Sequence, residues 1–309
     1  MELVQGLPQP INERPTVLTI GAFDGVHHGH QHLIGSVVRR ARMLGCQSAV
    51  LTFDPHPDLV IHPERDRHYL TSADERAQRI ADLGVDLLII LPFTREVMGQ
   101  SAHEFMSRIC RAVALRELWV GWDFALGRGR EGDLPRLRTI GHELGYSIHP
   151  VDPFVLDSAT VSSSRIRAAL RAGDVDTAAT LLGRPFSLRG PVMEGDRRGR
   201  TIGFPTANVA VDTQHALPAD GVYICHAWLG DQRHGAVTNV GIRPTFAGAH
   251  RTVEAYLLDF VDEIYGETLR LDFLHRLRGE QKFDGIAALI AQITEDVGAA
   301  RAWLKQQTL

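Results

Sequence analysis

Two histidines flank a glycine in the stretch Phe-Asp-Gly-Val-His-His-Gly-His, from Phe23 to His30. His27, Gly29 and His30 form the pattern H-x-G-H, whose imidazoles can donate hydrogen bonds to a phosphate that gains negative charge during attack. A glycine between them lets backbone and phosphate approach closely. The pattern therefore suits a phosphate ligand, although taken alone it is also typical of a solvated loop that a chain with 15 histidines can contain by chance.

A serine-rich segment later in the same half of the chain offers further phosphate ligands. It reads Val-Ser-Ser-Ser-Arg-Ile-Arg from Val161 to Arg167. Ser163 and Ser164 provide hydroxyls at the start of a predicted helix, and Arg165 provides a cation for a triphosphate. Taken alone, the segment is a simple serine N-cap. Together with the H-x-G-H pattern, it predicts a nucleotide site.

A third stretch, from Gly190 to Asn208, concentrates glycines ahead of Pro-Thr-Ala-Asn. Such a loop can bring backbone N–H groups close to phosphate oxygens. It lacks the Gly-Lys-Ser/Thr of a Walker A loop, and by itself it is typical of a flexible hairpin with a basic tip. Thr206 and Asn208 alternate on a predicted strand, so both side chains lie on one face, where their oxygens could complete a Mg²⁺ shell with ATP phosphates.

Helices and strands alternate in the first half of the chain. Apolar patterns predict strands at 16–20, 48–53, 85–91, 117–120 and 147–151, and helices at 29–44, 74–83, 102–114 and 134–144. Ser101 and Glu104 form a capping box before the third of these helices. Two short helices are expected within 161–182. The alternation predicts an α/β domain with a doubly wound parallel sheet, and the H-x-G-H turn stands where such a sheet binds ligands.

The second half of the chain is rich in predicted strands, at 186–192, 207–211, 221–228, 233–240, 252–258 and 268–277. Their spacing predicts a small antiparallel β-barrel. A helix over 284–304 places six apolar residues on one face, as packing against the barrel requires: Ile286, Leu289, Ile290, Ile293, Val297 and Ala300. We place the domain boundary between the two patterns, giving domains 1–184 and 185–309.

Composition excludes several classes of protein. The hydrophobic fraction of 44% and charged fraction of 23% are those of an ordinary globular protein. The net charge of −4 provides no global attraction for nucleic acid or anionic lipid. The three isolated cysteines indicate neither a disulfide framework nor a zinc site. Without a leader pattern or membrane-spanning run, we expect a cytoplasmic protein with no nucleic-acid or membrane partner, and leave weak self-association open.

The first two motifs together resemble the nucleotidylyltransferase superfamily. The stretches 21–30, 52–57 and 120–127 are further similar to the FMN adenylyltransferase module of bacterial bifunctional riboflavin kinase/FAD synthetases. The resemblance implies catalytic roles for His27, His30 and Arg165. It implies ATP contacts from Gly21, Phe23, Asp24, Gly29, Ser163 and Ser164, and flavin contacts from Asp54, Pro55, His56, Pro57 and Asp123. Without the resemblance, residues 54–57 are only a rigid turn.

The glycine-rich stretch 190–208 is similar to the riboflavin kinase signature GxVxxGxxxGRxxGfPTAN. The resemblance implies a catalytic Glu254, Mg²⁺ held by Thr206 and Asn208, and flavin contacts from Arg278 and Phe283. It implies ATP contacts from Gly195, Gly199, Arg200, Gly203, Pro205 and Thr206. Riboflavin and ATP would give FMN in the barrel domain, and FMN and ATP would give FAD and pyrophosphate in the α/β domain, with Mg²⁺ in both.

Two positions depart from the common family pattern. Ala125-Leu126 stands where an Arg-Phe pair is frequent, and Ser164 stands where threonine is frequent. The serine keeps the hydroxyl, whereas the alanine removes a cation from the adenylyltransferase site. Three alternatives stay open at this point: an enzyme whose kinase alone is active, a flavin-binding regulator or carrier, and an RNA-binding role for the barrel.

Overall fold

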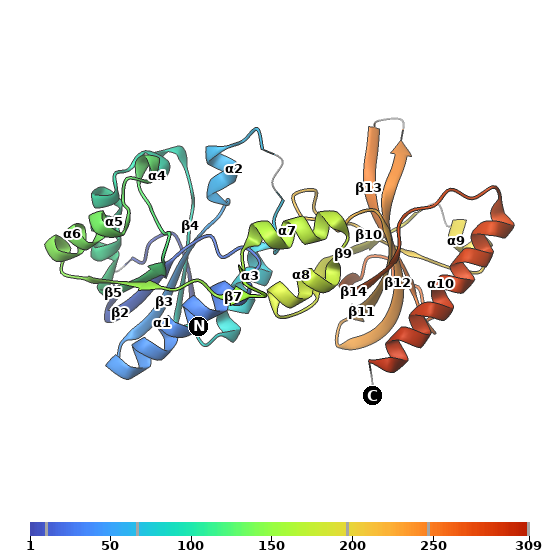
Figure 1. The fold of residues 1–309 in the computed structure, drawn as a ribbon, viewed down its shortest axis with the longest axis horizontal. Helices are drawn as coiled ribbons and strands as arrows, with labels where there is room; N and C mark the ends of the chain where they lie inside the picture. The colour runs from blue at the N-terminus through green and yellow to red at the C-terminus, as the bar shows by residue number, and fades with distance from the viewer. Residues whose placement is uncertain (10–11, 66–67, 196–197, 246–247, 308–309) are drawn as a thin grey trace. The chain divides into compact units, whose positions relative to one another are not determined.

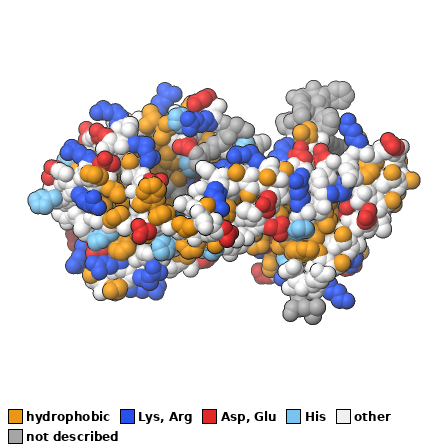
Figure 2. All heavy atoms as spheres, in the orientation of Figure 1, with side chains coloured by type: hydrophobic (Ala, Val, Ile, Leu, Met, Phe, Trp, Pro, Cys, Tyr) orange, Lys and Arg blue, Asp and Glu red, His pale blue; other side chains and the backbone are white. Residues whose placement is uncertain are grey.

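The computed structural model describes residues 1–9, 12–65, 68–195, 198–245 and 248–307. The chain forms two compact units, residues 1–163 and 164–309, which we describe separately. The domain division predicted from the sequence, 1–184 and 185–309, stays a prediction. No helix in the described ranges is long and apolar enough to cross a membrane. Figure 2 shows basic and acidic side chains interspersed over the visible face.

The first unit is built on a six-stranded parallel sheet, which confirms the predicted α/β fold (Figure 1). The strand order is β1-β4-β3-β2-β5-β6. The strands are β1 (Glu2–Gln5), β2 (Asn12–Ile20), β3 (Gln47–Phe53), β4 (Leu87–Leu91), β5 (Val113–Gly121) and β6 (Ser147–Val151). The helices are α1 (His28–Leu44), α2 (Pro57–Ile61), α3 (Ala73–Asp82), α4 (Arg95–Gly99), α5 (Ala102–Ala112) and α6 (Leu134–Leu144). A small antiparallel pair, β7 (Val155–Leu156) and β8 (Ala159–Thr160), follows.

Most predicted elements of this unit are present, and the exceptions have local causes. The capping box of Ser101 and Glu104 opens α5 as predicted. Residues 113–114, predicted as the end of that helix, belong instead to β5, because the buried β-branched Val113 pairs with β2. The sequence pattern missed β1, α2 and α4, which are only four or five residues long.

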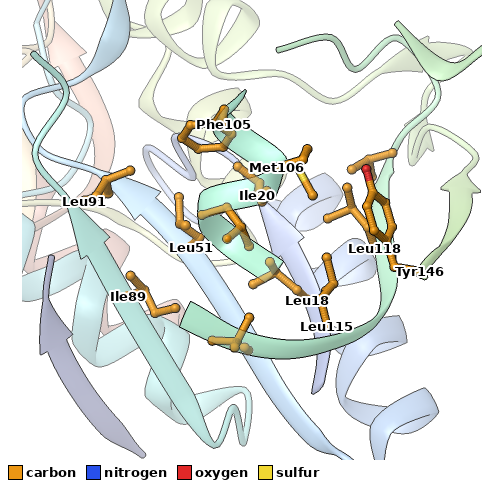
Figure 3. Packing of buried hydrophobic residues seen from close by; sticks show 14 of the residues in the cluster. Leu18, Ile20, Leu51, Ile89, Leu91, Phe105, Met106, Leu115, Leu118 and Tyr146 are labelled. Atoms are coloured by element: carbon orange, nitrogen blue, oxygen red, sulfur yellow. The ribbon is translucent and has the colours of Figure 1, made fainter. Parts of the chain in front are cut away.

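Helices cover both faces of the sheet. The inner sides of α5 and α6 pack on one face, where Leu18, Leu51, Phe105 and Leu118 belong to a single buried cluster (Figure 3). The helices α1 and α3 pack on the other face through Ile34, Val38, Ala77 and Ile80. Every residue of β3 is buried, as expected for a central strand covered on both faces.

The strand order places a switch point between β2 and β5. From β2 the chain proceeds outward through β3 and β4, and it then returns to β5 on the other side and proceeds to β6. Ligands of doubly wound sheets bind beyond the carboxyl ends of the strands at such a point. Here these ends are Ile20 and Gly121, and the H-x-G-H turn follows directly after the first of them.

The second unit contains a closed antiparallel barrel of six strands, in the order β10-β13-β12-β11-β14-β9, which confirms the second predicted fold. The strands are β9 (Phe186–Met193), β10 (Ala207–Val209), β11 (Gly221–Leu229), β12 (Gln232–Thr245), β13 (Gly248–Leu257) and β14 (Thr268–Arg278). The helices are α7 (Ser163–Ala172), α8 (Val175–Leu182), α9 (Arg198–Thr201) and α10 (Ile286–Gln306). The sequence pattern missed the four-residue α9.

The terminal helix α10 packs on the outside of the barrel (Figure 1). Val222, Ile224 and Val237 point outward from the strands and form a cluster with Val297 and Ala300 of the helix. The predicted apolar face is present with two corrections. Ile286 is 66% exposed, because it begins the helix beyond this cluster. The face also includes a buried carboxylate, Asp296.

Candidate active sites

The two histidines of H-x-G-H lie together at the start of α1. The His27 side chain caps the helix, with its Nδ1 accepting a hydrogen bond from the His30 backbone N–H at 3.3 Å. A neutral His27 that accepts at Nδ1 carries its proton on Nε2, so Nε2 is a hydrogen-bond donor. The two rings stack with centroids 3.6 Å apart. A Cβ on Gly29 would lie 3.1 Å from His27 Cε1, so glycine lets the turn close around this ring.

His30 is held as a neutral imidazole. Burial, followed by the nearby His27 and His56, lowers the pKa of His30 well below its usual value. The edge of Phe23 packs against its ring, with centroids 5.2 Å apart. Its Nδ1 is buried and has no hydrogen-bond partner among the described residues. Since buried polar atoms are normally paired, this nitrogen suits a bound ligand.

Asp24 and Ser163 fix the backbone around this turn. The buried Asp24 carboxylate accepts hydrogen bonds from the Leu70 and Thr71 backbone N–H groups, the shortest 2.9 Å long. Ser163 Oγ donates to the Asp24 carbonyl at 3.0 Å. Both side chains make protein contacts that shape the turn, and their predicted contacts with ATP stay predictions. Ser164 and Arg165 belong to the second compact unit, and their approach to ATP stays a prediction.

A buried arginine that the sequence analysis missed lies beside the first residue of the predicted flavin segment 54–57. Arg76 Nη2 donates to the Phe53 carbonyl at 3.1 Å and lies 3.8 Å from Asp54 Oδ1. His56 is buried, and its Nδ1 accepts from the Asp58 N–H as the cap of α2. Arg76 is fully buried, yet nothing in the local pattern of α3 separates it from the other arginine of that helix.

Asp123 is exposed on the loop after β5. Its carbonyl accepts a hydrogen bond from Arg130 Nη2 at 3.1 Å. Leu126, in the departing Ala125-Leu126 pair, packs against the core and pairs with Gly132. The loop that lacks a cation at position 125 therefore still contains the guanidinium of Arg130.

Two cavities meet in the second unit. The smaller, of about 160 Å³, is lined by several of the predicted ATP contacts: Gly195, Gly199, Arg200, Pro205 and Thr206. The larger, of about 400 Å³, is lined by three other predicted residues, Glu254, Arg278 and Phe283. Gly199 and Thr206 line both cavities. Two ligands bound in these cavities would therefore approach each other beside Thr206.

Three polar residues form a row across neighbouring strands. Asn208 of β10 pairs in register with Glu254 of β13, which pairs in register with Asn239 of β12. Paired residues point to the same face, with Cβ atoms about 4.5–5.5 Å apart. Val253 and Ala255, on either side of Glu254, are buried in the barrel. The row therefore faces outward, where Asn208 lines the smaller cavity and Glu254 and Asn239 line the larger.

The sequence analysis predicted Asn208 and Glu254 as site residues but not Asn239. Asn239 lies in the row because of how the strands pair, and the spacing of residues along the chain does not reveal that register. Thr206 and Asn208 supply oxygen ligands of the kind that Mg²⁺ prefers. A Cβ on Gly195 would lie 2.2 Å from the Asn208 amide nitrogen, so this glycine leaves space for the amide. The donor set fits Mg²⁺ bound together with ATP phosphates.

Arg200 and Gly203 differ in their relation to the smaller cavity. Arg200 lines it and forms an ion pair at 2.8 Å with Glu263, which also lines it. Gly203 is not among the described residues that line either cavity, and its φ of +87° ends the short turn of α9. The predicted contact of Gly203 with ATP stays a prediction. Residues 196–197 of the signature lie outside the described residues.

Replacing Gly199 with alanine is expected to weaken the binding of ATP in the smaller cavity, raising the KM for ATP by about 5- to 150-fold. A Cβ at this position would lie 2.2 Å from the Phe204 carbonyl oxygen, and such overpacking typically costs ~1–3 kcal/mol. Gly298→Ala, in α10 with nothing within 4 Å of the added Cβ, is the control. Steady-state kinetics in which both variants match the unsubstituted protein would contradict this expectation.

Two family models of known proteins match this chain, one in each half. Residues 9–165 match a family model described as FAD synthetase, and residues 182–304 match one described as riboflavin kinase. The chain belongs to the bifunctional riboflavin kinase/FMN adenylyltransferase family. Members of the family include a protein of Pseudomonas fluorescens that is 39% identical over 305 residues, covering 98% of this chain and 97% of the relative.

Two further likenesses extend over nearly the whole chain. A family member from Listeria monocytogenes is 36% identical over 289 residues, covering 93% of this chain and 92% of its own. A crystal structure named as a macrolide-efflux protein from Streptococcus pneumoniae has a TM-score of 0.89 and 30% identity, covering 98% of this chain and all of that one. We take the fold alone from this last likeness.

Proposed function

We propose that the chain makes flavin cofactors in two ATP-dependent steps. Riboflavin and ATP give FMN and ADP at the barrel, and FMN and ATP give FAD and pyrophosphate at the parallel sheet. The kinase assignment rests on one observation: the two cavities share the lining residue Thr206, and Glu254 lines the larger cavity. In this proposal ATP occupies the smaller cavity and riboflavin the larger.

In the kinase step, Glu254 accepts the proton of the riboflavin primary hydroxyl as that oxygen attacks the γ-phosphorus of ATP. The P–O bond to the β-phosphate breaks, and ADP leaves in the smaller cavity. Thr206 and Asn208 would hold Mg²⁺, which would neutralise charge on the phosphates. Backbone N–H groups of the glycine-rich loop bind the phosphate oxygens. Arg278 and Phe283 contact the flavin.

In the adenylyl step, a phosphate oxygen of FMN attacks the α-phosphorus of ATP, and pyrophosphate leaves. The N–H groups of His27 and His30 donate to the α-phosphate as its charge rises. Ser163, Ser164 and Arg165 contribute to binding the triphosphate, whose charge Mg²⁺ would shield when bound. The segment 54–57 and Asp123 form the flavin side. We assign this step to residues 1–184 and the kinase step to residues 185–309.

A chromatographic time course tests the proposal on the intact protein. With riboflavin, ATP and Mg²⁺, FMN should appear first and FAD should follow, and chelation of the metal should stop both. Accumulation of FMN without FAD would instead support the kinase-only alternative and direct attention to Ala125. Absence of any product would support a flavin-binding regulator or carrier.

A further inference from the structure

A buried ion pair joins the barrel to the terminal helix. Arg278, at the end of β14, donates from Nε to Asp296 Oδ1 and Oδ2 at 3.0 and 3.1 Å, and from Nη2 to Oδ2 at 2.8 Å. The side chains are only 16% and 6% exposed. Gln292, one turn earlier in α10, donates to Asp296 Oδ1 at 3.1 Å. This forked geometry holds the plane of the guanidinium in one orientation.

The pair forms part of the wall of the larger cavity. Arg278, Asp296 and Phe283 all line it. The guanidinium carbon of Arg278 lies 5.8 Å from the centroid of the Phe283 ring, and Nη1 donates to the Gly279 carbonyl at 3.1 Å. Among the described residues these contacts use three of the five N–H groups of the arginine, so the other two can donate to a ligand.

Asp296 also neutralises the positive charge of Arg278 in this wall. The flavin ring of riboflavin is polar at its edges but uncharged. An arginine paired with a carboxylate offers hydrogen-bond donors to such a ring with no net charge. Without Asp296, the buried guanidinium would be an uncompensated cation, and rotation toward water would relieve that cost. That rotation would remove the donors from their place in the wall.

We propose that Asp296 is a positioning residue of the kinase reaction. It holds Arg278 at the cavity wall, and thereby determines how tightly the flavin ring binds. Its action is on the riboflavin side of the reaction, because neither Asp296 nor Arg278 is among the described residues that line the smaller cavity. The inference rests on the proposed assignment of the larger cavity to riboflavin.

A matched pair of substitutions tests this role. Asp259 forms a similar fork with Arg301 of the same helix, with two bonds of 2.7 Å, but these side chains are 74% and 46% exposed. Neither residue is among those described as lining either cavity. Asp296→Asn should raise the KM for riboflavin by ~10- to 100-fold, as loss of a hydrogen bond to a charged group implies. Asp259→Asn should leave it unchanged.

Three measurements on the intact protein distinguish positioning of Arg278 from a role of Asp296 that only attaches α10 to the barrel. In Asp296→Asn, the KM for ATP in the kinase reaction and the rate of FAD formation from added FMN should stay within about threefold of the unsubstituted protein. Arg278→Lys, which keeps the charge but loses the fork, should raise the KM for riboflavin in the same way. Combined with Asp296→Asn, it should add little further. If Asp296→Asn does not fold, Arg278→Lys alone must show this separation of the two KM values.

An unchanged KM for riboflavin, or an equal rise in both KM values, would overturn the proposed role of Asp296. Failure of the underlying site assignment would look different. In that case Glu254→Gln would leave FMN formation intact, whatever the effect of Asp296→Asn. If Glu254→Gln abolishes FMN formation while Asp296→Asn has no effect on riboflavin binding, the site assignment stands and the positioning role is wrong.

Discussion

Glu254→Gln should lower the rate of FMN formation by about 10²- to 10⁴-fold, the usual contribution of a positioned general base. The substitution preserves shape but removes the group that accepts the hydroxyl proton. Glu254 is well placed for this transfer because it lies in register beside Asn208, which lines the neighbouring cavity. FAD formation from added FMN should be unchanged, since that reaction is assigned to residues 1–184.

The rates of the two reactions should be measured separately, with riboflavin or FMN as the starting flavin. Glu267→Gln is a suitable control, because Glu267 is exposed and is not among the described residues lining either cavity. A Glu254→Gln protein that forms FMN within tenfold of the unsubstituted rate would contradict the assignment of the base. A parallel loss of both reactions would indicate unfolding, which thermal denaturation would detect.

His30→Ala should lower the rate of FAD formation from FMN by about 10²- to 10³-fold, the typical effect of losing one preorganised donor to a developing charge. The buried Nδ1 of His30 has no described partner, and its ring is fixed between His27 and Phe23. The imidazole is therefore oriented before ATP binds. FMN formation from riboflavin should be unaffected.

His28→Ala provides the matched control for His30→Ala. His28 occupies the variable position of H-x-G-H, and its ring stacks on Phe154 with centroids 5.4 Å apart. We expect His28→Ala to lower the rate of FAD formation by a few-fold at most.

Because the pKa of His30 lies well below its usual value, His30 stays neutral above pH 6.5. The rate ratio between unsubstituted protein and His30→Ala should therefore be constant from pH 6.5 to 8, and a ratio that falls steeply with rising pH would contradict a neutral donor.

Local patterns in the sequence predicted the framework of both units. Alternating helices and apolar strands predicted the parallel sheet, and short strands separated by turns predicted the barrel. Such patterns record which face of each element is buried, and burial dominates folding. They failed for β1, α2 and α9, whose few residues contain less than two helical turns or too little alternation to stand out.

The sites were only partly predictable, because many of their contacts join residues far apart in the sequence. The Asp24 carboxylate accepts hydrogen bonds from the backbone of Leu70 and Thr71, 46 and 47 positions later in the sequence, and its contact with ATP stays a prediction. Asn239 reaches Glu254 only through the register of β12 with β13. Asp296 interrupts the apolar face of α10 to pair with Arg278, 18 positions earlier. None of these pairings has a local signal in the sequence.

The most direct test of two separate active sites is to mix the Glu254→Gln and His30→Ala proteins. Each variant is incubated alone and then with the other, with riboflavin, ATP and Mg²⁺, and all three flavins are followed by chromatography. We predict that Glu254→Gln alone leaves riboflavin unconverted, His30→Ala alone accumulates FMN, and the mixture produces FAD. A mixture that forms no FAD, or either single variant losing both reactions while folded, would contradict two independent sites in this chain.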